Sequence, residues 1–136
     1  MTIPDELRRA AEFHTHLGPF LVVGLRMGRV VTRELGSEPF TIRLTANTGR
    51  VPPYSCCVDG LQLSTPCTVG NGGLLVADTR EMSVEAVKDG ATVRVRLRDD
   101  VWRRIESECT EDNQEAFACG IWEMPEDALL VVTRGA

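Results

Sequence analysis

Both histidines of the chain lie in one short stretch near the N-terminus, "FHTHLGP", with a single threonine between them. Neutral imidazole is a common ligand for divalent metal ions, so two histidines this close are candidates for one metal or substrate site. On a regular helix, however, the side chains of His14 and His16 would point about 200° apart. The Gly18–Pro19 pair disfavours a continuous helix through this stretch. We therefore expect a helix to end between the histidines, so that both rings face one pocket; the alternative is a plain turn between two helices.

A second group of chemically reactive residues lies in "SCCVDGLQLSTPCT", residues 55–68. Cys56 would occupy the first turn of a helix, where the exposed N–H groups and the helix dipole favour the thiolate, which suits metal binding or nucleophilic attack. Asp59 shares that helix face and is a candidate ligand, a candidate base or a carboxylate that stabilises the helix start. Cys67 would lie about 15 Å from Cys56 across a straight helix. Both can bind one ion only if the chain folds back after Pro66 or if a second subunit contributes.

The cysteine content argues against a disulfide framework. The chain has five cysteines, an odd number, and Cys56 and Cys57 are adjacent. The N-terminal segment lacks the apolar core of a signal peptide, so we expect a cytoplasmic protein with free thiols. We expect Cys57, Cys109 and Cys119 to be structural residues.

The composition predicts one ordinary globular domain over residues 1–136. The hydrophobic fraction is 43% and the charged fraction is 26%, both typical of globular proteins. A net charge of -5 argues against a nucleic-acid surface, which needs clustered Lys and Arg. Because no apolar run reaches the roughly 18 residues of a membrane span, we expect neither nucleic acid nor membrane as a partner.

Hydrophobic periodicity, together with Pro and Gly at the boundaries, predicts the elements that must position these side chains. Helices are predicted over residues 5–14, 19–35 and 55–65, with a partly helical region at 99–118. Strands are predicted over residues 40–47, 73–79 and 128–133, and a hairpin over 83–98 around an Asp-Gly turn. We expect an α+β domain with one mixed β-sheet covered by helices.

Two glycines lie four residues apart on the second predicted helix. Gly24 and Gly28 share one face of an otherwise apolar helix, so another backbone can approach closely there. The sequence leaves two interpretations open, a contact between two subunits or tight packing within one chain.

The histidine and cysteine motifs together resemble those of the E-subunit family of formylmethanofuran dehydrogenase. The family patterns are F-H-x-H-x-[CG]-P, then S-C-x-x-D-[AG]-[IL]-Q followed by T-G-C-T-x-G, and the resemblance covers residues 5 to about 98. Gly18 stands where other members have cysteine, and Pro66 replaces a glycine of the pattern. The matching residues are Phe13, His14, His16, Gly18, Pro19, Ser55, Cys56, Asp59, Gly60, Leu61, Gln62, Thr65, Cys67, Thr68 and Gly70.

The resemblance implies an α+β core related to the catalytic domain of glyceraldehyde-3-phosphate dehydrogenase, usually paired as a homodimer. It also implies a metal, often zinc, in a pocket of His and Cys side chains. Several members carry a further C-terminal zinc finger with C-x-x-C pairs, and this sequence contains no such pair.

Residues and resemblance together predict a cytoplasmic metal-binding protein that is accessory to one-carbon or methanogenic metabolism, with other formylmethanofuran dehydrogenase subunits as candidate partners. The candidate ligands are His14, His16, Cys56 and Cys67, which suit Zn²⁺ first and Fe²⁺ second. One alternative is a metal- or thiolate-dependent enzyme acting on a small carbonyl or formyl compound, with Cys56 and Asp59 as catalytic residues. Another is a structural subunit with a vestigial site.

Overall fold

A computed structural model describes residues 2–135 of the chain as an α+β domain. The helices are α1 (Asp5–His14), α2 (Pro19–Leu35), α3 (Cys56–Ser64), α4 (Asp99–Glu108), α5 (Gln114–Glu123) and α6 (Glu126–Leu129). The strands are β1 (Arg43–Thr48), β2 (Leu74–Ala77), β3 (Arg80–Lys88), β4 (Ala91–Leu97) and β5 (Leu130–Gly135).

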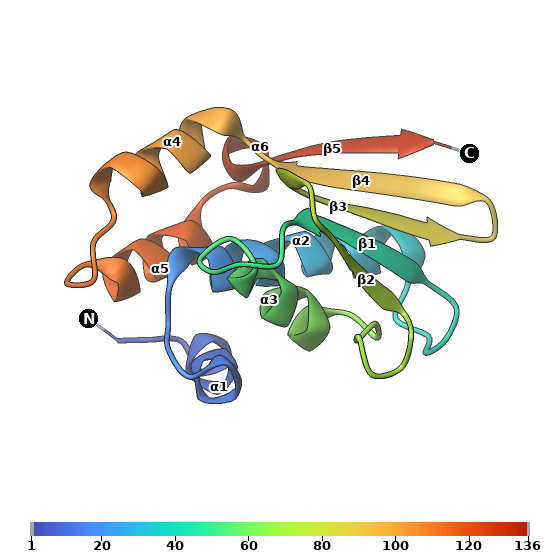
Figure 1. The fold of residues 1–136 in the computed structure, drawn as a ribbon, viewed down its shortest axis with the longest axis horizontal. Coiled ribbons are helices and arrows are strands. Elements are labelled where there is room, and N and C mark those ends of the chain that lie inside the picture. The colour runs from blue at the N-terminus through green and yellow to red at the C-terminus, as the bar shows by residue number, and fades with distance from the viewer. Residues whose placement is uncertain (1, 136) are drawn as a thin grey trace.

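The five strands form one mixed sheet in the order β2-β1-β3-β4-β5 (Figure 1). Strands β1 and β2 run parallel, and α3 lies between them in the chain, whereas all other neighbours are antiparallel. The β3–β4 hairpin turns at Asp89 and Gly90, whose φ angles of 49° and 83° are those of the predicted two-residue turn. The predicted α+β class with a mixed sheet is therefore confirmed.

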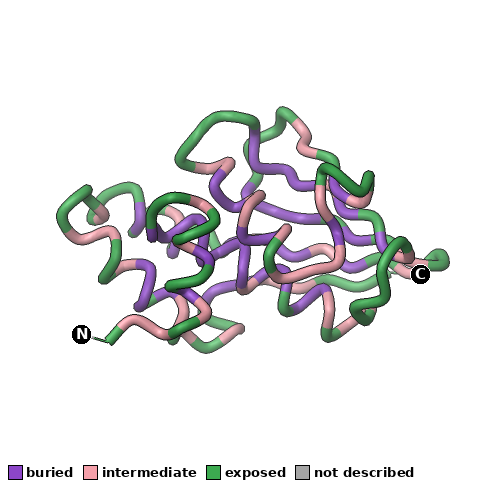
Figure 2. The backbone as a smooth tube through the Cα atoms, turned by 90° about the horizontal axis from the view of Figure 1, so that it is seen from below, coloured by how far each residue is buried: buried purple, intermediate pink, exposed green. Residues whose placement is uncertain are grey.

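Helix α2 is the centre of the core. It packs against α3, α5 and the strands β3 and β4 (Figure 1). Most of its residues are buried, and Figure 2 shows the buried segments in the interior of the molecule, with exposed segments around them. Pro19 is its first residue, and Gly36 ends it with a φ of 86°; both boundaries were predicted from these residue types. Among the helices of residues 2–135, none is long and apolar enough to cross a membrane.

The two glycines of α2 serve the contact with α3 within the same chain. A methyl group on Gly24 would overlap the carbonyl oxygen of Cys57, and one on Gly28 would overlap the hydroxyl of Ser64. Gly60 of α3 faces the α2 backbone in the same way, since a methyl group there would overlap the carbonyl oxygen of Leu21. Of the two interpretations that the sequence left open, the structure therefore shows close packing inside one chain.

The predicted strands differ from the structure in several details. Strand β1 begins at Arg43 because Phe40, at the predicted start, has a left-handed φ of 65° and is exposed. Strand β2 is shorter than predicted and lies at the edge of the sheet, where Leu75 is 69% exposed. The last predicted strand began at residue 128, but the short helix α6 extends to Leu129.

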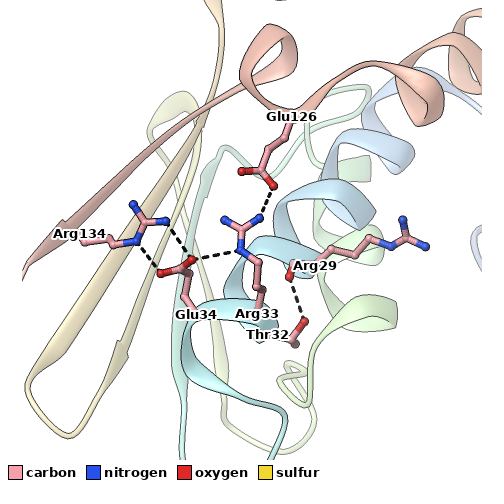
Figure 3. Close-up of polar contacts among 6 residues, drawn as sticks. All are labelled: Arg29, Thr32, Arg33, Glu34, Glu126 and Arg134. Atoms are coloured by element: carbon pink, nitrogen blue, oxygen red, sulfur yellow. Dashed lines mark hydrogen bonds and ion pairs between the residues drawn. The ribbon is translucent and has the colours of Figure 1, made fainter.

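An ion-pair network joins the end of α2 to the C-terminal elements (Figure 3). Arg134 of β5 donates two hydrogen bonds to the Glu34 carboxylate, at 2.5 and 2.9 Å. Arg33 bonds both Glu34 and Glu126 of α6, at 3.1 and 2.5 Å. Since Glu34 is only 19% exposed, these bidentate contacts hold β5 against the body of the protein.

Candidate metal centre

The two histidines converge because the first helix ends between them. His14 is the last residue of α1, and Thr15 takes a left-handed φ of 94° while its N–H closes the helix on the Ala11 carbonyl at 2.7 Å. This turn brings the imidazole of His16 to 4.7 Å from that of His14, measured between ring centroids. The geometry is the one expected from the helix break in the sequence.

Cys56 completes a cluster of three donor groups. It is the first residue of α3, and it is 8% exposed. One ligand atom from each of His14, His16 and Cys56 can be chosen so that all lie within 4.8 Å of one another. Two imidazoles and one sulfur at this spacing have the chemistry of a zinc or iron site.

A chain of hydrogen bonds orients His14. Its Nδ1 lies 2.6 Å from Oδ2 of Asp59, and Nε2 of Gln62 donates to the other carboxylate oxygen at 3.1 Å. The side-chain oxygen Oε1 of Gln62 in turn accepts a hydrogen bond from the backbone N–H of Val69 at 2.9 Å. Asp59 is therefore placed behind the cluster, as the partner of a histidine rather than as a member of the donor set.

The second ring nitrogen of His14, Nε2, is the clearest sign of a ligand site in this cluster. Nε2 is buried and has no hydrogen-bond partner within residues 2–135. A buried polar atom normally has a partner, because leaving it without one costs free energy. Since Asp59 accepts the proton on Nδ1, the lone pair of Nε2 is available to a metal ion.

The electrostatics of Cys56 differ from the prediction for a helix start. Burial raises the pKa of this thiol, and the charge of Asp59 raises it further, while a backbone hydrogen bond lowers it. The helix-start argument considered only local N–H groups, whereas desolvation of the anion is the larger effect here. Without a metal, the thiol form is favoured.

The structure does not bring Cys67 to this cluster. The nine residues of α3 span about 14 Å, and Cys67 follows the far end of that helix. It is buried there, with its Sγ 3.4 Å from the carbonyl oxygen of Ile42. The chain turns back into β2 only after Cys67, so this cysteine stays at the far end of α3 and the first of the two conditions for a shared ion is not met.

The other cysteines are separate from the donor cluster. Cys57 is fully buried, with its Sγ 3.8 Å from the sulfur of Met27, and burial raises its pKa to about 12. Cys119 is also buried, and Cys109 is partly exposed. All five cysteines are free thiols, as predicted.

A pocket of about 370 Å³ adjoins the cluster, and His16 and Cys56 form part of its wall. Gly18 also lines the pocket, and a methyl group there would be in contact with Gln114 at 3.4 Å and with His16 at 3.7 Å. The cluster is therefore open on this side. The other lining residues are Pro19, Phe20, Leu21, Pro53, Tyr54, Ile105, Glu106, Cys109, Thr110 and Glu111.

Sequence reasoning missed the Gln62 bond and the pocket. The first could have been found, because Gln62 follows Asp59 by three residues on one helix face. The pocket had no signal in the sequence, since six of its fourteen lining residues come from α4, α5 and the loop between them, which are about 90 residues from the histidines.

Comparisons with known proteins identify relatives of this chain in sequence and in fold. The family model described as "FmdE, Molybdenum formylmethanofuran dehydrogenase operon" matches residues 13–131. A curated relative from Archaeoglobus fulgidus, named "Probable S-adenosyl-L-methionine-binding protein", is 34% identical over 105 residues. That match covers 72% of this chain but only 28% of the relative, so the chain spans little more than a quarter of its length.

A solved structure has the same fold. It is a protein from Syntrophus aciditrophicus that is described as like FmdE of a tungsten formylmethanofuran dehydrogenase, with a TM-score of 0.74 and 24% identity over 96% of this chain and 70% of that chain. The expected relation to the catalytic domain of glyceraldehyde-3-phosphate dehydrogenase stays a prediction.

Proposed function

This chain belongs to the FmdE family, and from that premise we propose that it is a formylmethanofuran dehydrogenase-related protein that binds one metal ion through His14, His16 and Cys56. The ion is Zn²⁺, with Fe²⁺ as the second choice, because imidazole and thiolate donors suit both. We further propose that the protein is accessory to one-carbon metabolism.

The observation that carries the proposal is the buried Nε2 of His14, which has no hydrogen-bond partner among residues 2–135 and belongs to a residue that clusters with His16 and Cys56. The carboxylate of Asp59 behind His14 adds support, because metal-binding histidines commonly donate their other N–H to a carboxylate. When bound, the ion would act as a Lewis acid toward a molecule in the adjoining pocket.

A metal-dependent enzyme acting on a small carbonyl or formyl compound is the second candidate function. Three protein donors beside an open pocket are typical of catalytic zinc sites, whereas structural zinc sites are closed by four protein ligands. A metal-free thiolate mechanism has less support, because burial raises the pKa of Cys56. Asp59 is also a weak candidate for a base, since both of its oxygens are engaged by His14 and Gln62.

Metal content of purified variants tests the proposal. We expect about one ion per chain in the unaltered protein, and well below one in His16→Ala and in Cys56→Ala after gentle dialysis. Cys67→Ala and Cys109→Ala are the matched controls, which remove a thiol outside the donor set and should keep the ion. Full occupancy in both His16→Ala and Cys56→Ala would leave the cluster as a turn with a vestigial site, and loss in Cys67→Ala would point to a ligand from a second copy of the chain.

The assembly is a separate proposal. We propose a homodimer from the family resemblance alone, because Gly24 and Gly28 are used inside the chain. Light scattering at micromolar concentration should give twice the mass of 15.0 kDa, and a monomer would contradict it. We also propose that the protein associates with other formylmethanofuran dehydrogenase subunits and that it is located in the cytoplasm.

A further inference from the structure

We propose that the pocket beside the metal centre holds a small, largely apolar molecule that carries no negative charge at its rim end and whose donor atom completes the coordination of the metal. The inference rests on the proposed metal site and adds the chemical class of its ligand. It is carried by the composition of the pocket wall and by the charges at its rim.

The ligand can reach the metal because the donor cluster and the pocket share residues. His16 and Cys56 belong to both. Gly18 lines the same pocket and has no side chain to take up space beside His16. A donor atom of a molecule in the pocket would therefore lie next to two of the three proposed metal ligands.

The wall of the pocket is largely apolar, and contacts between aromatic rings hold it in place. Phe20 and Tyr54 meet edge to face with ring centroids 5.2 Å apart, and Tyr54 meets Trp102 in the same way at 5.8 Å. Leu21 and Ile105 add buried aliphatic surface. Because this wall is held in place before any ligand enters, an apolar ring can bind without ordering it. The volume of about 370 Å³ lies at the low end for ligand pockets, which fits one ring with a few substituents.

The rim of the pocket is acidic. Glu106 and Glu111 line it, and within the described part of the chain no lysine or arginine does. The hydroxyl of Tyr54 donates to Glu106 at 2.9 Å, so it is already committed to a carboxylate. The guanidinium of Arg80 stacks on the Tyr54 ring at 4.7 Å but is not part of the lining.

The start of helix α2 has the opposite electrostatic effect to the two carboxylates. The first turn of α2 lines the pocket, and the start of a helix carries about half a positive charge. A bound divalent ion would also be positive and would attract a negative donor atom, so the two carboxylates act on the part of the ligand that faces the rim. This combination selects against a carboxylate or a phosphate at the rim end of the ligand.

The test uses the full chain loaded with Co²⁺, whose visible absorption reports coordination. The probes are imidazole, 1-phenylimidazole and 4-(imidazol-1-yl)benzoate, which share the donor nitrogen and differ in the apolar ring and the charge. We expect 1-phenylimidazole to bind at least about tenfold more tightly than imidazole, because the phenyl ring is buried. The benzoate should bind at least about threefold more weakly than 1-phenylimidazole at low salt, and Glu111→Gln should reduce that difference.

A pair of variants locates the ligand. Thr110 lines the pocket, so Thr110→Trp should lower the affinity for 1-phenylimidazole at least about fivefold by narrowing it, with the Co²⁺ spectrum retained. Ser107 is exposed and does not line the pocket. Ser107→Trp should therefore change neither the affinity for 1-phenylimidazole nor the Co²⁺ spectrum.

The outcomes separate the two proposals. Equal affinity for imidazole and 1-phenylimidazole, tighter binding of the benzoate, or full affinity in Thr110→Trp overturns the pocket inference alone, provided that Co²⁺ binds normally. Failure to bind Co²⁺ at all overturns the metal site and this inference with it.

Discussion

The imidazole of His14 and the carboxylate of Asp59 lie 2.6 Å apart, although 45 positions separate them in the sequence. The contact joins the end of α1 to the first turns of α3. It also fixes which ring nitrogen carries the proton, because Asp59 accepts from Nδ1 and leaves the lone pair on Nε2. Gln62 holds the second carboxylate oxygen, so the orientation of Asp59 is itself determined.

We expect Asp59→Asn to weaken metal binding by about 10–100-fold, the usual cost of losing a carboxylate behind a metal-binding histidine. Competition with a chromophoric chelator measures the affinity. Glu12→Gln removes an exposed carboxylate of α1 and serves as the control, with no expected change. Equal affinities for the two variants would assign Asp59 a purely structural role.

Metal binding should release a proton from Cys56. Burial, followed by the charge of Asp59, raises the pKa of this thiol, so at neutral pH the metal-free site holds the proton that the ion must displace. The apparent affinity should therefore rise about tenfold for each pH unit between about pH 6 and 8. Calorimetry of Zn²⁺ binding in buffers of different ionisation enthalpy should report about one proton released. An affinity independent of pH would mean that Cys56 is a thiolate before metal arrives.

Gly24→Ala should lower the free energy of unfolding by about 1–3 kcal/mol, because the added methyl group overlaps the Cys57 carbonyl and the α3 backbone. Gly120→Ala is the matched control. It also lies in a helix, and a methyl group there meets no atom within 4 Å among residues 2–135, so it should stabilise by about 0.5–1 kcal/mol. Urea denaturation measures both. If Gly24→Ala changed only the monomer–dimer equilibrium, the contact would lie between subunits.

Acid should weaken the link between α2 and β5. Hydrogen bonds from Arg134, then from Arg33, lower the pKa of Glu34 from 4.5 to about 2. A carboxyl group whose folded-state pKa is depressed contributes stability above its unfolded pKa and loses it as the pH falls toward the folded value. Unfolding free energy should thus fall between pH 4.5 and about 2 less steeply in Glu34→Gln than in the exposed control Glu38→Gln. Identical slopes would show that this network does not contribute to acid stability.

The first two helices were predictable to the residue because their boundaries are local. Pro19 can begin a helix but not continue one, and Gly36 takes a positive φ that few other residues accept. The strands were less predictable. Whether Leu75 is buried depends on the position of its strand in the sheet. The sequence of a four-residue strand does not show whether that strand lies at the edge or in the middle of the sheet.

The candidate site divides in the same way. The convergence of His14 and His16 follows from the end of helix α1 between them, which the sequence predicts. The pKa of Cys56 and the position of Cys67 depend on burial and on the path of the chain after α3, which are tertiary properties. The role of Asp59 was narrowed only when its partner across 45 residues was known.

Because of the glycine contact between α2 and α3, substitutions in the protein core can change the geometry of the candidate metal site. His16 precedes α2 and Cys56 begins α3, so the gap between imidazole and thiol follows the separation of the two helix axes. A larger residue at Gly24 or Gly60 must push the helices apart, which carries the donors away from each other before the fold is lost. Substitutions in this buried interface are therefore expected to alter metal affinity, although none of the substituted side chains would touch the ion.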